Sequence, residues 1–306
     1  MKLFYKDINI RTFIARRLRS VNLFNKFFPI GTGNDGRYCY IVWMTHLNRL
    51  NTNESVGVPN NVAELGPGDS IGVGLAALLS GAKSYVALDI HNYYDVQKSL
   101  QDFDDILDLF KRKASIEGSF KFPHKILTEE VLKKSLNPDR IEKIRKEICN
   151  ISSDNKMIKY VAPWSDPKFI QSNSVDFILS QCVLEHVDKL EECYLSMFNW
   201  LKVDGYMSHL IDFQCHDFAK EWNGHWFWSE QKWQFVKGTD KFDFTAFNRI
   251  PASKHIKFTK NSGFKNLKLE PLKRKSNFKH NQLSSNFSWL TEQDITTSGL
   301  ILFAQK

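Results

Sequence analysis

The sequence predicts an α/β protein with seven strands in a mostly parallel sheet and helices on both faces. A short apolar strand at 62–65 leads into a glycine turn, a helix rich in small residues at 71–79 and a second strand at 84–90. A strand, helix and strand of this length form a right-handed parallel unit. Strands and helices alternate again from 157 to 211, and two last strands are expected near the C-terminus.

Residues 1–60 are expected to form a helical extension ahead of a main domain at 61–306. The apolar residues of its first helix fall near one face: Phe13, Ile14, Leu18 and Val21. A second helix is expected at 38–50. Basic residues flank the apolar face, so two interpretations stay open: a helix that caps the main domain, which we favour, or one that lies on an anionic membrane surface.

The main domain contains two expected insertions. A helical insertion at 91–156 has an amphipathic stripe over 96–110 and a highly charged stretch over 127–148. The alternation that follows predicts strands at 157–161 and 175–179, a helix at 190–201 stopped by Asp204-Gly205, and a strand at 206–211.

The second insertion, at 213–248, is rich in tryptophan and phenylalanine. Its aromatic side chains suit either a buried core or a lid that stacks on a ligand, and Trp222 and Trp226 would share a face if the segment is helical. A helix at 251–262 begins with proline in its first turn and ends before glycine. The last strands are expected at 266–270 and 300–304, with a polar loop between them.

Composition excludes several classes of protein. Apolar residues make up 42% and charged residues 25% of the chain, as in a globular protein. No apolar run is long enough for a membrane span, and no signal peptide is evident, so a cytoplasmic protein is expected. The five cysteines show no C-x-x-C spacing, which argues against disulfides and zinc ribbons.

Charge is distributed unevenly along the chain. The net charge of +8 divides into +6 over residues 1–30, +8 over 254–280 and −6 elsewhere. Basic clusters bind nucleic acid, anionic lipid or phosphorylated molecules, but a solvated lysine-rich surface explains them as well. A weak peripheral membrane contact therefore stays open.

Acidic residues flank the glycine turn. Glu64 comes two residues before Gly66, and Asp89 ends the next strand. Glycines let the backbone approach a ligand at a helix N-terminus. The dinucleotide fingerprint would require glycine where Ile71 stands, and a carboxylate at position 64 suits a ligand ammonium group better than a pyrophosphate. Two carboxylate oxygens at position 89 match two adjacent ribose hydroxyls, so the turn and Asp89 together indicate a nucleoside ligand.

Further segments follow in a characteristic order: Tyr160 to Trp164, Ser174 to Gln181, Val183 to Val187 and Leu201 to Tyr206. With Glu64 to Gly68 and Asp89, they resemble class I S-adenosylmethionine-dependent methyltransferases over residues 62–264. Ser70 departs from the pattern, because many members have a third glycine there. Ser208 to Phe213 and Asn248 to Pro251 are similar to segments of bacterial methyltransferases of small-molecule or surface-polysaccharide pathways.

The resemblance implies a Rossmann-like fold, S-adenosyl-L-methionine as cofactor and a small-molecule or saccharide acceptor. The implied cofactor-binding residues are Glu64, Gly66, Pro67, Gly68, Asp89, Ile90, Ala162, Trp164, Ser180 and Gln181. Nucleic acid as acceptor is disfavoured, because Ser180-Gln181-Cys182-Val183 replaces the Asn/Asp-Pro-Pro-aromatic sequence of amino-methylating nucleic-acid enzymes. Cys182 also lacks the preceding proline of cytosine C5 methyltransferases.

A hydroxyl acceptor needs a general base, for which histidine is suited by its pKa near neutrality. We expect His186, Asp212 and His216 to face the transferable methyl group, with Asp212 orienting His216. His209 alternates within a strand and is expected to be a core residue. A divalent metal on His209, Asp212 and His216 is the less favoured alternative, so no metal ligand is assigned.

Two other functions fit the sequence less well than methyl transfer. A nicotinamide-dependent oxidoreductase is disfavoured by Ile71 and by the absence of a Tyr-x-x-x-Lys pair near the fourth strand. A non-catalytic relative that keeps the fold as a binding module is disfavoured by the intact glycine turn and acidic residues. The leading hypothesis is O-methylation by in-line transfer.

Overall fold

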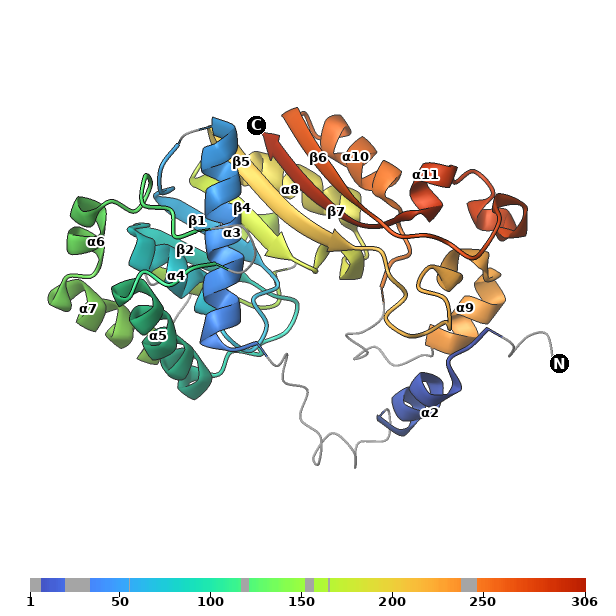
Figure 1. Ribbon diagram of the computed structural model, residues 1–306, viewed down its shortest axis with the longest axis horizontal. Coiled ribbons are helices and arrows are strands. Elements are labelled where there is room, and N and C mark those ends of the chain that lie inside the picture. The colour runs from blue at the N-terminus through green and yellow to red at the C-terminus, as the bar shows by residue number, and fades with distance from the viewer. Residues whose placement is uncertain are drawn as a thin grey trace. The chain divides into compact units, whose positions relative to one another are not determined.

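The computed structural model describes residues 7–19, 34–54, 56–116, 121–151, 157–164, 166–237 and 247–306. Its seven-stranded sheet has the order β3-β2-β1-β4-β5-β7-β6 (Figure 1). The strands are β1 (Asn61–Leu65), β2 (Ser84–Leu88), β3 (Ile158–Val161), β4 (Val175–Gln181), β5 (Leu201–Asp212), β6 (Lys265–Lys273) and β7 (Thr297–Gln305). The ladders of β1 with β2, β1 with β4 and β2 with β3 are parallel, which confirms the predicted Rossmann-like α/β fold.

Helices alternate with these strands in the predicted order. They are α2 (Ile10–Arg19), α3 (Gly36–Glu54), α4 (Gly72–Ser80), α5 (Val96–Lys111), α6 (Glu129–Ser135), α7 (Pro138–Cys149), α8 (Leu190–Trp200), α9 (Glu230–Lys237), α10 (Ala252–Asn261) and α11 (Glu292–Ile295). The three helices of the 91–156 insertion begin where Asp95, Thr128 and Asn137 accept backbone N–H groups of the first turn. The short 3₁₀ turns of the described residues are η1 (Pro167–Phe169), η2 (Leu184–His186), η3 (Gly224–Phe227), η4 (His280–Gln282) and η5 (Ser285–Phe287).

The predicted start of β5 is wrong. The strand begins at Leu201, so the expected turn at Asp204-Gly205 lies inside it. Asp204 takes a left-handed conformation with φ of 63°, which aspartate tolerates better than most residues. Lys202 donates to Asp176 of β4 at 2.8 Å, so the first residues of β5 are tied to the neighbouring strand.

The predicted polar loop between the last two strands is also wrong in part. β6 continues to Lys273, and the N–H of Arg274 still donates to the carbonyl of Thr296 at 2.9 Å. Further on, α11 is nucleated by a capping box, because Thr291 and Asp294 accept each other's backbone N–H groups. Main-chain pairing and capping therefore order part of this polar segment.

The described residues divide into two compact units. One, the glycine-turn unit, contains the described residues of 31–181, 195–208 and 303–306. The other, the histidine unit, contains those of 1–30, 182–194 and 209–302. The division at residue 60 that the sequence suggests stays a prediction.

The core of the glycine-turn unit depends on small residues in α4. All nine residues of this helix are buried. A Cβ atom at Gly74 would lie 2.2 Å from the ring of Tyr85, so only glycine lets β2 approach the helix so closely. On another side of α4, the indole of Trp43 in α3 donates to Ser80 at 2.7 Å. Helix α3 is therefore part of this core.

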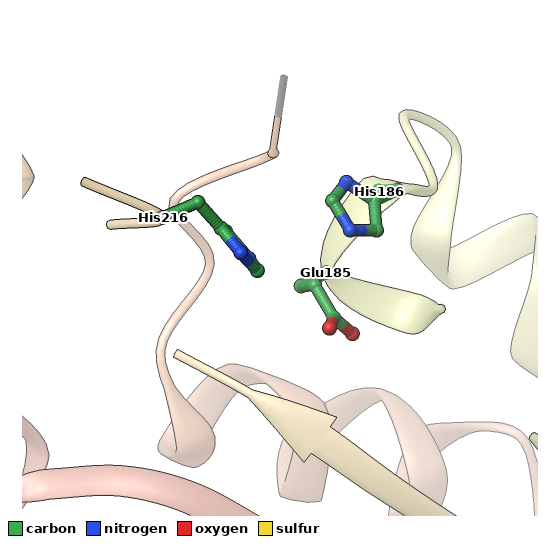
Figure 2. A group of neighbouring side chains, drawn as sticks. All are labelled: Glu185, His186 and His216. Carbon is green, nitrogen blue, oxygen red and sulfur yellow. The ribbon is translucent and has the colours of Figure 1, made fainter. Parts of the chain in front are cut away.

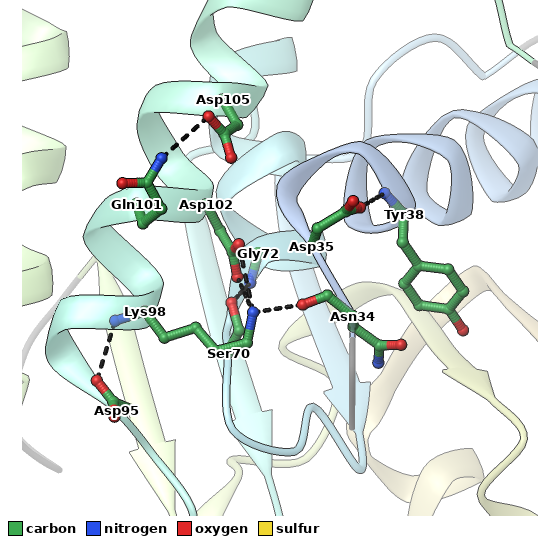
Figure 3. Close-up of polar contacts among 10 residues, drawn as sticks. All are labelled: Asn34, Asp35, Tyr38, Ser70, Gly72, Asp95, Lys98, Gln101, Asp102 and Asp105. Carbon is green, nitrogen blue, oxygen red and sulfur yellow. Dashed lines mark hydrogen bonds and ion pairs between the residues drawn. The ribbon is translucent and has the colours of Figure 1, made fainter. Parts of the chain in front are cut away.

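Polar contacts join the start of α3 to α5 (Figure 3). Lys98 of α5 donates to the carbonyl of Asn34 and pairs with Asp102 at 3.1 Å. Asp35 accepts the N–H of Tyr38 at 2.7 Å and so caps α3. Ser70 similarly accepts the N–H of Gly72 at 3.1 Å where α4 begins.

The histidine unit has an aromatic core. Its buried cluster consists of Ile8, Cys215, Phe218, Ala219, Trp228, Trp233, Val236 and Phe247. Phe13 of α2 packs against this cluster and stacks on Phe235 with ring centroids 5.3 Å apart. An isolated antiparallel β-bridge between Ile8 and Ala219 fixes the residues that precede α2.

Helix α2 packs on the aromatic core of its unit through Phe13. Ile14 is 50% exposed, whereas Phe13 is partly buried. The side chain of Leu18 and all of Val21 lie outside the described residues, so the predicted apolar face is described only at its start. Among the described helices, none is both long and apolar enough to cross a membrane.

Candidate active site

Strand register brings the predicted cofactor-binding segments to one edge of the glycine-turn unit. Leu65 of β1 is paired with Leu88 of β2 and with Ser180 of β4, and Leu88 is paired with Val161 of β3. Parallel strands in this register end together. The residue after each of these paired positions, namely Gly66, Asp89, Gln181 and Ala162, therefore lies along the same edge.

Asp89 connects the tip of β2 to the glycine turn. Its Oδ2 accepts the N–H of Gly68 at 3.1 Å, and its Oδ1 accepts the N–H of Ile90 at 2.7 Å. Gly66 and Gly68 have φ angles of 67° and 74°, which favour glycine. Burial raises the pKa of Asp89 and the backbone N–H groups oppose that rise. Each carboxylate oxygen still has a lone pair for a ligand hydroxyl.

Glu64 lies beneath the glycine turn and is bonded to a tyrosine that the sequence analysis did not single out. The hydroxyl of Tyr85 donates to Glu64 Oε2 at 2.5 Å, and both side chains are buried. Burial raises the pKa of Glu64 to about 8, the hydrogen bond from Tyr85 opposes the rise, and the charge of Asp89 adds to it. This carboxyl group would ionise more readily beside a cation.

Apolar and aromatic groups surround the tip of β2. Ile90 is 52% exposed, which is unusual for isoleucine next to a buried strand. The N–H of Trp164 donates to the carbonyl of Asp89 at 3.0 Å, so the segment that contains Ala162 follows the strand tip. Pro67 is buried in the turn. Tyr160 donates to the carbonyl of His91 at 3.3 Å.

Gln181 has a partner that the sequence analysis missed. His46 of α3 is buried, and its Nε2 lies 3.3 Å from Gln181 Oε1. The Nδ1 atom of His46 lies 2.7 Å from the hydroxyl of Ser208 in β5. His46 belongs to a segment that was predicted as an extension, so no local pattern connected it to the motif at 180–181. Ser180 itself is fully buried.

In the histidine unit, Glu185, His186 and His216 converge (Figure 2). Each has a potential ligand atom within 4.8 Å of the other two. The rings of His186 and His216 have centroids 5.4 Å apart. His216 has a φ of 45° and Asp217 of 61°, so the loop after β5 is strained where it presents this imidazole.

Glu185 is the buried member of this group. It is 2% exposed, and neither carboxylate oxygen has a hydrogen-bond partner in the described part of the chain. Burial raises its pKa well above the usual value, and the charge of Asp212 adds to the rise. Backbone N–H groups of Glu185 itself and of Asp212 oppose the rise without completing a hydrogen bond to the carboxylate.

Asp212 and Cys182 are electrostatic neighbours of Glu185. Asp212 Oδ1 accepts the N–H of Gln214 at 2.8 Å, so its side chain caps the turn after β5, and its orienting of His216 stays a prediction. Burial raises the pKa of Cys182 to about 12, and the charges of Glu185 and Asp212 contribute. A thiolate nucleophile at Cys182 is therefore disfavoured.

Asn248 holds the turn that contains Glu185 and His186. Its side-chain amide donates to the carbonyls of Leu184 at 2.8 Å and Val187 at 3.0 Å, and its backbone N–H donates to the carbonyl of Glu185 at 2.6 Å. The sequence of 248–251 by itself indicates no role for Asn248. A partner 64 residues away cannot be identified from local periodicity.

His209 is buried in β5, as the strand pattern predicts. Its side chain is fully buried, and burial lowers its pKa to about 3. An imidazole with this pKa stays neutral at pH 7. His209 does not belong to the group of Glu185, His186 and His216.

The aromatic segment is core at the two tryptophans considered for a lid. Trp226 is fully buried and Trp222 is 7% exposed. Their indole N–H groups donate to the carbonyls of Arg249 and Lys275, each at 2.9 Å. The ring centroids are 6.4 Å apart in an edge-on arrangement, so the two indoles pack on each other rather than offer an open face.

No protein-family model matches the chain, and no curated protein matches it. Solved structures of methyltransferases are similar to it. Phosphoethanolamine N-methyltransferase 2 of Haemonchus contortus, solved with S-adenosyl-L-methionine, is 12% identical with a TM-score of 0.45, over 92% of this chain and 60% of that one. An S-adenosylmethionine-dependent methyltransferase of Mesorhizobium loti is 12% identical with a TM-score of 0.41, over 90% of this chain and 100% of that one. The chain thus spans less than two thirds of the nematode enzyme's length.

Proposed function

We propose that this chain binds S-adenosyl-L-methionine and transfers a methyl group to an oxygen atom of a small-molecule or saccharide acceptor. The observation that carries the proposal is the arrangement at the tips of β1 and β2. There Asp89 accepts the N–H of Gly68 across a turn with two left-handed glycines. Glu64, one strand away, is a buried acid that accepts a hydrogen bond from Tyr85.

The residues present fit the cofactor. The Asp89 carboxylate has spare lone pairs for ribose hydroxyls, and the exposed side chain of Ile90 offers an apolar surface to a nucleoside base. Glu64 would gain an opposite charge from the ammonium group of the ligand, which would lower its pKa. Ala162, Trp164, Ser180 and Gln181 complete the proposed contact set, with Pro67 shaping the turn.

When bound, S-adenosyl-L-methionine supplies a methyl group on a positively charged sulfur. The contribution of the protein is to hold that group and the acceptor in line and close together. On the acceptor side we propose His186 and His216 as the polar groups, with Asp212 nearby. In this proposal Asp212 contributes its negative charge, and it fixes the turn after β5 because its carboxylate accepts the N–H of Gln214.

A nicotinamide nucleotide suits this chain less well. Ile71 is fully buried immediately before α4, at the position where a dinucleotide site would require glycine. Glu64 would also be a second negative charge close to a pyrophosphate. Both features favour a ligand whose charge near the turn is positive.

Isothermal titration calorimetry of the full chain tests the proposal. Wild type is expected to bind S-adenosylmethionine or S-adenosylhomocysteine with one site per chain, in preference to NAD. Asp89→Ala should weaken binding by about 1–3 kcal/mol, because ligand hydroxyls lose a charged acceptor. Asp108→Asn removes an exposed carboxylate on α5 and serves as the matched control.

Preferential binding of NAD or NADP by the wild type would overturn the cofactor proposal. Equal affinity of wild type and Asp89→Ala would remove Asp89 from the site. Incubation of the protein with labelled methyl donor and host extract, followed by mass spectrometry of the labelled products, then tests the acceptor class. Label on nitrogen or carbon only would contradict O-methylation.

A further inference from the structure

Glu185, His186 and His216 together offer the kinds of donor atoms that bind metal ions. Two imidazole nitrogens and one carboxylate oxygen lie within 4.8 Å of one another. Donors at metal–ligand distances of about 2.0–2.2 Å are at most about 4.4 Å apart, so small side-chain rotations suffice to place all three around one ion. Figure 2 shows the three side chains as neighbours, with the His216 ring extending toward the turn that carries Glu185 and His186.

The burial of Glu185 independently indicates a missing positive partner. Its side chain is 2% exposed and neither oxygen accepts a hydrogen bond from the described residues. An unpaired buried carboxyl group is destabilising, and such groups in folded proteins are normally paired or coordinate metals. The charge of Asp212, a neighbour of Glu185, has the same sign and does not compensate it.

We propose that Glu185, His186 and His216 bind one divalent transition-metal ion, such as Zn²⁺, Co²⁺ or Mn²⁺, and leave coordination positions open for an oxygen of the methyl acceptor. Two imidazoles with one carboxylate suit these ions, whereas Mg²⁺ prefers a set of oxygens. Three protein ligands are typical of catalytic rather than structural sites, which have four.

The turn that presents two of the ligands is fixed from outside. Asn248 bonds the backbone of residues 184, 185 and 187, so Glu185 and His186 keep their positions without a metal. Partners of this kind orient metal ligands and affect metal affinity. His216 enters from a different loop and lies against Phe247, with ring centroids 5.4 Å apart.

The role of the metal toward an acceptor rests on the proposed function, but metal binding does not. A bound ion would hold a hydroxyl oxygen of the acceptor and lower its pKa. His186 and His216 would then act as ligands, and the acidified hydroxyl would lose its proton to solvent. This assignment favours oxygen over nitrogen as the attacking atom.

The test measures metal binding on the full chain without S-adenosylmethionine. After chelator treatment and dialysis, Zn²⁺, Co²⁺ and Mg²⁺ are titrated separately by calorimetry, and the Co²⁺ form is followed by its visible absorption. We expect one Zn²⁺ or Co²⁺ per chain and much weaker binding of Mg²⁺. Glu185→Gln and His216→Ala should each reduce Zn²⁺ affinity about 100-fold or more, since even outer partners contribute 10–100-fold. His124→Ala, an exposed histidine of the other unit, is the matched control.

X-ray absorption of the Zn²⁺-loaded wild type needs no variant that could misfold. Nitrogen and oxygen neighbours at about 2.0–2.2 Å, with two imidazoles, support the proposal; sulfur at about 2.3 Å would assign the metal to a cysteine such as Cys182 and overturn it. Failure of the wild type to bind either ion, or unchanged affinity in both folded variants, would also overturn it. If the protein binds no metal but still binds S-adenosylmethionine, the metal proposal fails while the proposed function stands.

Discussion

The two units gather their polar groups by different routes. In the glycine-turn unit, Glu64 and Asp89 lie at the ends of adjacent parallel strands, and the register alone brings them to one edge. In the histidine unit, Glu185 and His216 come from loops after different strands, and Asn248 fixes the first loop through contacts across 64 residues. A ligand site made by register can be recognised from a short motif, whereas one made by converging loops requires long-range packing.

The units also differ in how their buried acids are satisfied. Both oxygens of Asp89 accept backbone N–H groups, and Glu64 accepts the hydroxyl of Tyr85. Glu185 has no such partner among the described residues. Hydrogen bonds from described residues therefore satisfy the acids of the first unit, while the described residues of the second unit donate none to Glu185.

The largest expected effect concerns the packing of the histidine unit. Arg249 is 5% exposed; it donates to the carbonyls of His225 at 2.6 Å and Trp228 at 2.9 Å, and it pairs with Glu230 at 3.2 Å. Arg249→Met should lower the free energy of unfolding by about 3–4 kcal/mol, because buried carbonyls lose a charged donor. Urea denaturation measures the change.

Arg274→Met, at an exposed arginine of the same unit, is the control and should change stability by less than about 1 kcal/mol. Equal losses in the two variants would mean that the buried contacts of Arg249 do not organise the aromatic core.

The next effect concerns close packing in the glycine-turn unit. Gly74→Ala should destabilise the protein by about 2–3 kcal/mol, since the new Cβ would lie 2.2 Å from the Tyr85 ring. On an open helix position the same change would stabilise by up to about 1 kcal/mol, so the sign is diagnostic. Thermal and urea unfolding measure it, and the loss should shrink in a Tyr85→Ala background. An equal loss in both backgrounds would contradict the clash.

Glu64 should make the stability of its unit depend on pH. Its pKa is raised to about 8 from an ordinary value of 4.5, so between these pH values the folded protein binds more protons than the unfolded chain. The stability associated with the protonated form is complete below pH 4.5 and is lost as pH rises through about 8. From pH 6 to pH 8, Glu64→Gln should gain about 2 kcal/mol of unfolding free energy relative to wild type.

For Glu142→Gln, at an exposed glutamate of α7, the difference in unfolding free energy from wild type should stay constant between pH 6 and pH 8. Calorimetry in buffers of different ionisation enthalpy adds a second readout: S-adenosylmethionine should release a proton on binding to wild type near pH 7 and none on binding to Glu64→Gln. Absence of that release would separate Glu64 from the ligand.

The smallest effect concerns α2. Phe13→Ala should cost about 1 kcal/mol of stability, because a partly buried ring that stacks on Phe235 is lost. Ile14→Ala, on the same helix at a 50% exposed position, should change stability by less than about 0.5 kcal/mol. If Phe13→Ala leaves stability unchanged but reduces binding to anionic vesicles, the membrane-surface interpretation would replace docking.

Sequence patterns predicted most elements because the determinants are local. The helix at 96–110 was expected from its apolar stripe and is observed as α5, Val96–Lys111, with Asp95 as its cap. The start of β5 was misplaced because Asp204-Gly205 is a turn signal in isolation, and the ion pair of Lys202 with Asp176 draws this segment into the sheet. Local turn propensity is overridden where a neighbouring strand supplies a bonding partner.

The sequence by itself determined the α/β class, the strand order along the chain and the acidic residues beside the glycine turn, since parallel strands of known order align their ends whatever surrounds them. Only the tertiary structure decided that Tyr85 bonds Glu64, that His46 reaches Gln181, and that Glu185 joins His186 and His216. Those partners lie on other elements, and side-chain burial and loop packing, which short-range patterns do not encode, bring them together.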